Sequence, residues 1–271
     1  MPGPVGEAAG LARKMNYGVN MTKIILHGAC GRMGRMITDI VRKDEDAVIV
    51  AGVDAFQNAP SDFPLYKTLE EVTEQGDVLV DFSNSKVTDQ VIDYCVSKKL
   101  PAVICTTGLS ADQLTHLRDA SKVIPVLRSA NMSVGINLLL NILKEAAPKL
   151  AAAGFDIEIL EKHHNQKLDA PSGTAIALAD AVNEALPEPY AYVYDRSGRR
   201  EARPQKEIGI SAIRGGTIPG DHDVIFAGED EVVTFSHRAY SRAIFGKGAV
   251  AAAKFLSGKP AGLYDMQDVL A

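Results

Sequence analysis

The densest group of side chains with acid–base chemistry lies between residues 161 and 174 of this chain. His163, His164 and Lys167 fall within five residues, directly after the expected strand Asp156–Leu160. Histidine exchanges protons near neutral pH, and lysine adds a fixed positive charge and a second proton donor. These side chains therefore predict an acid–base site that attracts anions.

The sequence Pro171-Ser172-Gly173-Thr174 follows this cluster and precedes an expected apolar helix at Ala175–Leu186. Proline and serine are typical of a helix start, and Gly173 leaves the backbone N–H groups open to a ligand. A helix N-terminus with free N–H groups and a threonine hydroxyl suits a carboxylate. We therefore expect an anion to bind beside the acid–base groups.

Three other interpretations of this segment compete with the acid–base site. The two histidines could bind a metal with Glu161 or Asp169, but adjacent residues of a strand point to opposite sides, and we predict no metal. A solvated charged loop is a second alternative. A plain helix cap is the third, although Ala175 stands where a capping box would have Glu or Gln.

A glycine turn near the start of the chain predicts a dinucleotide site. Gly28, Gly31 and Gly34 follow an apolar strand and precede a helix, and Asp54 ends the next apolar run, 20 residues after Gly34. Glycine permits a tight turn that approaches a pyrophosphate, whose charge meets the helix N-terminus. The carboxylate accepts hydrogen bonds from the ribose hydroxyls. A tight strand–helix connection without a ligand is the alternative.

The residues around Asp54 bear on the choice of cofactor. Ala55, Phe56 and Gln57 follow it, and none of them is cationic. A 2′-phosphate would therefore meet a negative charge and no positive one. We predict that NADH is preferred, and NADPH remains an option.

Cys105, Thr106 and Thr107 follow another apolar strand. The carboxyl ends of parallel strands line the cofactor crevice in a doubly wound sheet, which places these residues near the nicotinamide. An ordinary polar loop that leads to a helix cap at Ser110 is the alternative.

The elements that must position these residues differ between the two halves of the chain. In the first half, short apolar runs alternate with helical segments, which predicts a parallel sheet covered on both faces. In the second half the strands alternate in polarity, which predicts an open, largely antiparallel sheet beside long helices. The expected strands are 22–27, 47–53, 78–82, 102–105, 123–127, 156–160, 207–214, 224–228 and 231–237, and the expected helices are 35–42, 86–98, 110–121, 133–150, 175–186 and 246–256.

Composition limits the partners of the 271-residue chain. The formal net charge is −5, so there is no general attraction for nucleic acid or anionic lipid, and no apolar run is long enough to cross a bilayer. The three cysteines have no metal-like spacing and predict free thiols in a reducing cytoplasm. Residues 1–21 are expected to form a tail outside the fold.

Several motifs together resemble the dihydrodipicolinate reductase (4-hydroxy-tetrahydrodipicolinate reductase) family of lysine and diaminopimelate biosynthesis. The similarity runs from about Thr22 to the C-terminus. The motifs are G-A-C-G-R-M-G-R at 28–35, T-T-G at 106–108, E-K-H-H-N-Q-K-L-D-A-P-S-G-T-A at 161–175, R-G-G-T-I-P-G-D-H at 214–222, S-R at 241–242 and G-L-Y-D-M-Q-D-V-L at 262–270. The 161–175 motif is the most specific of them.

The resemblance implies roles for individual residues. His163 matches the catalytic acid–base residue, Lys167 a second proton donor, and His164, Gly173 and Thr174 the groups that hold the substrate carboxylates. Cys30, Cys105 and Met132 differ from residues common in the family, and no acid–base group is lost. The implied cofactor contacts are Gly28, Ala29, Cys30, Gly31, Arg32, Met33, Asp54, Cys105, Thr106, Thr107, Ser129, Ala130, Asn131 and Met132.

The resemblance also implies the domain organisation and the partners. It gives a Rossmann-type dinucleotide-binding domain at 22–131, an α+β domain at 132–241 whose open mixed sheet binds substrate and joins a homotetramer, and a C-terminal segment at 242–271 that returns to the first domain. The implied substrate is a small cyclic dicarboxylate. Two alternatives remain, namely another two-domain dehydrogenase that lacks the 161–175 motif, and a non-enzymatic NAD-binding regulator, which would need a nucleic-acid or partner module.

Overall fold

Seven strands form one sheet in which every pairing is parallel. The computed structural model of the chain describes residues 21–56, 61–129 and 131–271. Residues 1–20 of the expected tail at 1–21, and the expected contact Ala130, therefore lie outside the described residues. The order β12-β6-β5-β4-β1-β2-β3 places β1 and β4 at the centre. The strands are β1 (Thr22–His27), β2 (Ala47–Val53), β3 (Leu65–Tyr66), β4 (Val78–Asp81), β5 (Ala102–Ile104), β6 (Pro125–Arg128) and β12 (Gly262–Tyr264).

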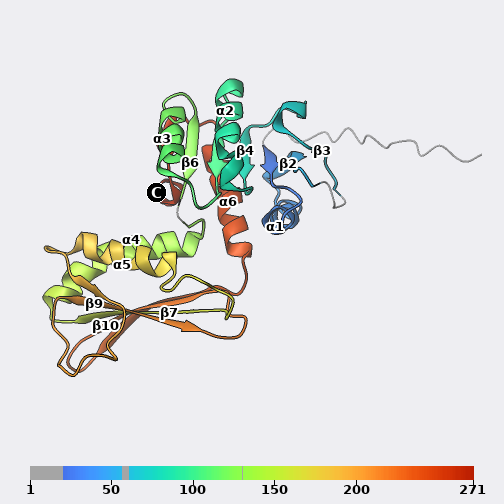
Figure 1. The fold of residues 1–271 in the computed structure, drawn as a ribbon. Helices are drawn as coiled ribbons and strands as arrows, with labels where there is room; N and C mark the ends of the chain where they lie inside the picture. Colours follow the sequence, from blue (N-terminus) through green and yellow to red (C-terminus); the bar gives the residue numbers. More distant parts are fainter. Residues whose placement is uncertain (1–20, 57–60, 130) are drawn as a thin grey trace, which may run out of the picture.

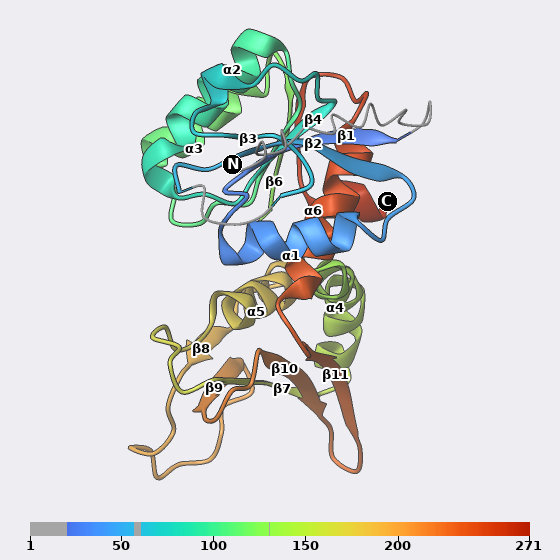
Figure 2. The ribbon, with the colours of Figure 1, turned by 90° about the vertical axis from the view of Figure 1, so that its right-hand side faces the viewer.

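Helices cover both faces of this sheet, with an apolar core on each side (Figures 1 and 2). The arrangement confirms the predicted doubly wound α/β fold. One face carries α1 (Arg32–Val41), α6 (Ala243–Leu256) and α7 (Met266–Leu270). The other carries α2 (Thr88–Lys98) and α3 (Ala111–Ala120), and two short 3₁₀ turns, η1 (Leu69–Glu71) and η2 (Ser85–Val87), precede α2.

A second sheet of five strands carries two helices on one face only, α4 (Val134–Ala152) and α5 (Gly173–Ala185). Figure 1 shows these helices side by side above the sheet, with its other face open below. The strands in spatial order are β11 (Val232–Arg238), β10 (Asp221–Ala227), β7 (Asp156–His163), β9 (Glu207–Arg214) and β8 (Ala191–Val193).

This second sheet is mixed, and the expectation of a largely antiparallel sheet is wrong for half of it. β10 pairs antiparallel with β7 and β11, whereas β9 pairs parallel with both β7 and β8. The chain leaves β7, forms α5 on one face, and returns in the same direction as a strand. Such a crossover produces a parallel pair.

Two boundaries differ from the prediction in ways that affect the candidate site. Helix α1 begins at Arg32 rather than Arg35, so Gly34 lies inside its first turn. Strand β7 continues to His163 rather than ending at Leu160, because buried and half-buried residues keep alternating along its whole length. His163 is therefore part of a strand and not of the loop that follows it.

Three short strands were not predicted, namely β3, β8 and β12, each of two or three residues. Strands this short carry too few residues to show a periodic pattern. β12 pairs with β6 at the edge of the first sheet, so residues from the end of the chain lie in the seven-stranded sheet.

Candidate active site

His163 is fixed by a carboxylate on its own strand. On β7, Ile157 and Ile159 face the helices, and the alternation places Glu161 and His163 on the same face. His163 Nδ1 lies 2.6 Å from Glu161 Oε2. Burial lowers the pKa of His163, and the bond to Glu161 opposes this shift without cancelling it. The imidazole is therefore neutral at pH 7, with its proton on Nδ1.

Glu161 connects His163 to two other elements. Arg214, at the end of β9, donates to Glu161 Oε1 at 2.7 Å and to Oε2 at 2.8 Å. The backbone N–H of Ser172, the N-cap of α5, donates to Glu161 Oε1 at 2.9 Å. Burial raises the pKa of Glu161, but these bonds outweigh burial and hold it below its usual value. Sequence reasoning considered Glu161 only as a metal ligand and gave Arg214 no role of its own.

A second buried histidine lies against His163. The rings of His163 and His222 meet edge to face with centroids 5.1 Å apart. His222 Nε2 lies 3.0 Å from Ser172 Oγ, and burial lowers the pKa of His222 to about 4. His222 is therefore neutral over the physiological pH range, and its ring packs against His163 in a position held by Ser172.

Lys167 and His164 lie in the turn that follows β7. The Lys167 ammonium pairs with both carboxylate oxygens of Asp169 at 2.7 and 2.8 Å, and it is close enough to His163 to lower the histidine's pKa. The His164 side chain is half-buried. The turn itself is held by Gly216, whose carbonyl accepts the Asn165 N–H at 3.2 Å.

The start of α5 has the features of an anion site. Ser172 caps the helix by accepting the Ala175 N–H, no acidic residue lies in the first turn, and Gly173 is exposed. The Asn131 amide donates to Thr174 Oγ1 at 3.0 Å, which leaves the threonine hydroxyl proton free to donate to a ligand. This bond also joins the connection between β6 and α4 to the predicted substrate residues.

The glycine turn has the geometry that a dinucleotide needs. Gly28 has φ of +80°, and a Cβ there would lie 2.7 Å from the Phe82 carbonyl oxygen. A Cβ on Gly34 would overlap the Gly28 carbonyl oxygen. Gly31 caps α1 without a side chain, and the first turn has no acidic residue, so the N–H groups are available to a phosphate.

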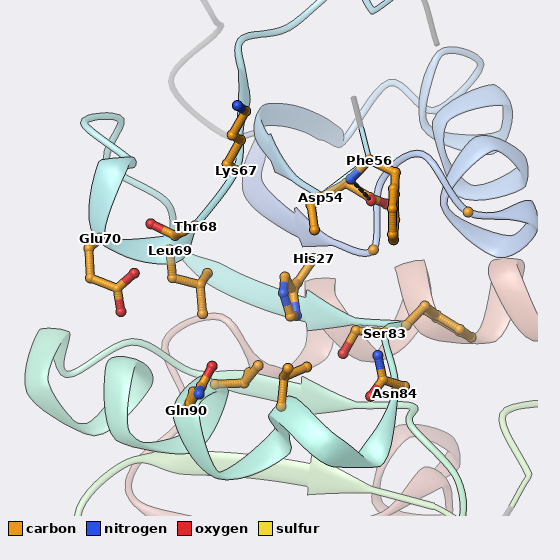
Figure 3. A pocket seen from close by; sticks show the side chains of 16 residues that line it. His27, Asp54, Phe56, Lys67, Thr68, Leu69, Glu70, Ser83, Asn84 and Gln90 are labelled. Atoms are coloured by element: carbon orange, nitrogen blue, oxygen red, sulfur yellow. Dashed lines mark hydrogen bonds between the residues drawn. The ribbon is translucent and has the colours of Figure 1, made fainter. Parts of the chain in front are cut away.

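Asp54 lies at the end of β2 in a cavity of about 480 Å³ beside the glycine turn. Its Oδ2 accepts the Cys30 N–H and its Oδ1 accepts the Phe56 N–H, both at 2.9 Å, and each oxygen keeps a lone pair for a ribose hydroxyl. Lys67 lines the same cavity, and Figure 3 shows it at the upper rim with its ammonium nitrogen directed away from the interior. The NADH prediction assumed that no cation lies near Asp54. This holds for the neighbours Ala55 and Phe56, Gln57 lies outside the described residues, and Lys67 lines the cavity itself.

Asp81, at the end of β4, organises the carboxyl edge of the first sheet. It is fully buried and accepts bonds from His27 Nδ1 at 2.8 Å, Thr106 Oγ1 at 2.6 Å, and Ser83 Oγ at 2.6 Å. Burial raises the pKa of Asp81, but these donors outweigh burial and lower it. The sequence analysis missed Asp81 and His27. The signal was present for His27, which ends the apolar strand directly before the glycine turn. Asp81 is distant from that turn in the sequence and meets it through the pairing of β1 with β4.

The remaining predicted cofactor residues divide into exposed and inward-facing groups. Arg32 and Thr107 are exposed, and Met33, Cys105, Ser129 and Asn131 are half-buried, with Ser129 Oγ donating to the Asn131 carbonyl at 3.0 Å. The side chains of Ala29, Cys30 and Met132 are buried, and Thr106 donates its hydroxyl to Asp81. The side chains of these four residues are therefore not directed to solvent, and any contact with a ligand would come mainly from their backbone atoms.

Within residues 21–56, 61–129 and 131–271, no hydrogen bond or ion pair joins the glycine turn to His163. The same described residues contain no group of three His, Cys, Asp or Glu side chains that could hold a metal ion. None of their helices has the length and apolar character that a membrane crossing requires.

Comparison with known proteins covers nearly all of the described chain. Residues 22–132 match the family described as dihydrodipicolinate reductase, N-terminus, and residues 135–270 match its C-terminus. The chain is 52% identical to the 4-hydroxy-tetrahydrodipicolinate reductase of Caldanaerobacter subterraneus subsp. tengcongensis, over 92% of this chain and 98% of that protein. It is 48% identical to the enzyme of the same name from Clostridium tetani, over 92% of this chain and 97% of that one.

A solved structure shares the fold and about a quarter of the aligned residues. The chain is similar to a dipicolinate-bound dihydrodipicolinate reductase from Paenisporosarcina sp. TG-14, with a TM-score of 0.77 and 26% identity, over 93% of this chain and 100% of that chain.

Proposed function

The chain belongs to the dihydrodipicolinate reductase family, and we propose on that premise that it reduces 4-hydroxy-tetrahydrodipicolinate to tetrahydrodipicolinate in lysine and diaminopimelate biosynthesis. In chemical balance, loss of water gives dihydrodipicolinate, and one hydride and one proton then add to its conjugated ring. The observation that carries this proposal is the cluster of His163, Lys167 and the N-terminus of α5, which suits a dicarboxylate that must be protonated.

The α5 N-terminus and Lys167 bind and orient the substrate carboxylates in this proposal. The Thr174 hydroxyl and the N–H groups near Gly173 donate to one carboxylate, and His164 assists from the turn after β7. Lys167 exchanges its pairing with Asp169 for a substrate carboxylate. The exchange replaces one ammonium–carboxylate hydrogen bond by another of the same charge-assisted kind, so it does not leave the ammonium without a partner.

His163 supplies the proton, with Lys167 as the alternative donor. The free imidazole is neutral because burial lowers its pKa. A bound dicarboxylate adds negative charge next to the ring and raises that pKa, so the imidazole takes up a proton on Nε2 as the substrate binds. His163 is then charged in the complex, where a proton donor is needed.

A nicotinamide dinucleotide supplies the hydride when it is bound. The residues present fit such a group. The glycines place no side chain between the backbone of the turn and a ligand, and Asp54 keeps lone pairs for ribose hydroxyls. We propose that NADH is preferred, since a 2′-phosphate would approach the Asp54 carboxylate. Lys67 is the one described cation that lines the Asp54 cavity, and we assign any use of NADPH to it.

Copies of the chain associate through the open face of the five-stranded sheet in this proposal and form a homotetramer. The apolar side chains on that face support the assignment. Ile213 is 47% exposed, Val232 is 61% exposed, and both alternate with residues that contact the helices. We also place the enzyme in the cytoplasm, which is the compartment that suits the unpaired thiols of Cys30, Cys95 and Cys105.

A turnover assay tests the proposed function. Freshly generated dihydrodipicolinate is added to the purified chain with NADH or NADPH, and oxidation of the cofactor is followed by absorbance. We expect substrate-dependent oxidation that is faster with NADH at equal concentration. The absence of turnover with either cofactor would overturn the proposal.

A further inference from the structure

Glu161 is a buried carboxylate at a position where the strand pattern calls for an apolar residue. It continues the face of β7 that begins with Ile157 and Ile159, and it is 0% exposed. Burying a carboxylate is unfavourable unless its oxygens are fully paired, because the charge loses its hydration. An apolar side chain at this position would avoid that cost. The carboxylate therefore points to a role besides packing.

The hydrogen-bond donors to Glu161 come from three elements of the site. The donor from His163 is Nδ1, which leaves Nε2 of the same ring free. Arg214 from β9 and the Ser172 N–H from α5 hold both carboxylate oxygens, and His163 donates through Nδ1. A carboxylate only accepts, so this contact fixes the proton on Nδ1. His163 Nε2 has no hydrogen-bond partner among the residues that the structure describes.

The space at His163 Nε2 is kept open by a glycine. A Cβ on Gly220 would lie 3.0 Å from Nε2, which is closer than ordinary van der Waals contact. On the other side, the edge-to-face contact with His222 restricts rotation of the imidazole ring. The ring is thus held by Glu161 at one nitrogen and by the edge-to-face contact with His222, and its other nitrogen is left accessible.

We propose that Glu161 is a positioning residue that sets the tautomer and orientation of His163 so that Nε2 exchanges the proton, and that Arg214 holds the Glu161 carboxylate in place for this purpose. The effect on turnover rests on the proposed function, in which His163 is the donor. The effect on the imidazole does not depend on that function.

The charged and titratable groups around His163 predict opposite effects for two substitutions. The Glu161 carboxylate raises the pKa of His163, and Lys167 and Arg214 lower it. Across the sheet, His222 is neutral near pH 7, with its pKa lowered to about 4 by burial. Glu161→Gln should therefore lower the pKa of His163, and Arg214→Gln should raise it. A packing role alone would not move the pKa in opposite directions.

The direct test is nuclear magnetic resonance of the full chain with nitrogen-labelled histidine. We expect the wild-type His163 ring to carry its proton on Nδ1, and the two substitutions to shift its pKa in the stated directions. Glu158→Gln is the matched control, because Glu158 lies on the same strand and pairs with Arg196 and Arg203 away from His163. A wild-type ring protonated on Nε2, or an unchanged pKa in Glu161→Gln, would overturn the proposal.

The pH profile of kcat/KM gives a second readout. Each unit of decrease in the pKa of His163 lowers its protonated fraction at higher pH by about tenfold, so the Glu161→Gln profile should fall at lower pH than the wild-type profile. Glu161→Asp keeps the charge and should restore part of the shift. If Glu161→Gln does not fold, Arg214→Gln replaces it in both measurements, and a pKa of His163 that is not raised in Arg214→Gln would refute the proposal.

The two readouts separate failure of this proposal from failure of the proposed function. If wild-type protein shows the Nδ1 tautomer and the opposite pKa shifts but does not turn over dihydrodipicolinate, the function is wrong and the positioning of His163 stands. If wild-type protein is active and Glu161→Gln leaves both the pKa of His163 and the pH profile unchanged, the positioning role is wrong.

Discussion

Replacing Asp54 by Asn should weaken the enzyme's use of NADH while sparing its use of NADPH. In the structure the two carboxylate oxygens accept the Cys30 and Phe56 N–H groups and keep lone pairs toward the cavity. Asn keeps one acceptor oxygen, which suffices for the partly buried Cys30 N–H. Phe56 is 77% exposed, so water replaces the lost acceptor there. The substitution therefore removes the charge with little change to the fold.

The expected loss in kcat/KM follows from the hydrogen bonds that the carboxylate would accept from the two ribose hydroxyls. A hydrogen bond to a charged group contributes about 1.5–3 kcal/mol, and a neutral bond about 1 kcal/mol. The loss over two hydroxyls is about 2 kcal/mol, which is roughly a 30-fold loss in kcat/KM for NADH. For NADPH the lost bonds are offset by removal of the repulsion between Asp54 and the 2′-phosphate. The NADH-to-NADPH ratio of kcat/KM should therefore fall by about the same 30-fold.

The assay compares kcat/KM for both cofactors in wild type, Asp54→Asn and Lys67→Ala at one saturating concentration of dihydrodipicolinate. Lys67→Ala is the matched control, because it removes the cation from the same cavity and should reduce the use of NADPH alone. Equal losses with NADH and NADPH in Asp54→Asn would refute the assignment of Asp54 to the ribose. A wild-type preference for NADPH would refute the reasoning from charge.

Two further predictions concern the acid–base group and the buried carboxylate of the first sheet. His163→Ala should lower kcat by about 10²–10⁴-fold and leave the Kd for NADH unchanged, as measured by steady-state kinetics and calorimetric titration; a near-normal kcat would refute the proton-donor role. Asp81→Ala leaves the hydrogen-bond donors of His27, Ser83 and Thr106 without an acceptor. It should reduce the free energy of unfolding by about 3–5 kcal/mol in urea titrations. Because the folded-state pKa of Asp81 is lowered, its contribution to the free energy of unfolding is present above the unfolded-state pKa of about 4 and is lost as pH falls through the folded-state pKa. The stabilities of wild type and Asp81→Ala should therefore converge in strong acid. A stability difference that stays constant down to strong acid would contradict this prediction.

Much of the fold was predictable because local patterns and tertiary packing agree. Strand β1 and its glycine turn, and the apolar run at β2, lie at the centre of a parallel sheet whose strands are buried on both faces. Continuous apolar runs of this kind are the expected signature. The parallel direction of β9 relative to β7 was missed because only the alternation within each strand was used. The expected helix at 175–186 between the two strands is the crossover that produces a parallel pair.

The site was predictable where its residues are close in the sequence and not where they are distant. His163, Lys167 and Thr174 lie within one motif, and their roles remain predictions from that motif. Arg214 is 53 residues from Glu161, and the register of β7 with β9 brings them together. Lys67 lines the Asp54 cavity because the Asp54 N–H pairs with the Tyr66 carbonyl, a contact between β2 and β3 that no sequence spacing reveals.

The most direct measurement of the central claim is the fate of the hydride. Dihydrodipicolinate is reduced by the wild-type chain in ordinary water, with NADH deuterated at both C4 positions, and the product is analysed by mass spectrometry and nuclear magnetic resonance. The account predicts one deuterium on a ring carbon of tetrahydrodipicolinate and one proton from solvent on its neighbour. Tetrahydrodipicolinate without deuterium, or no conversion of the cyclic dicarboxylate, would contradict it.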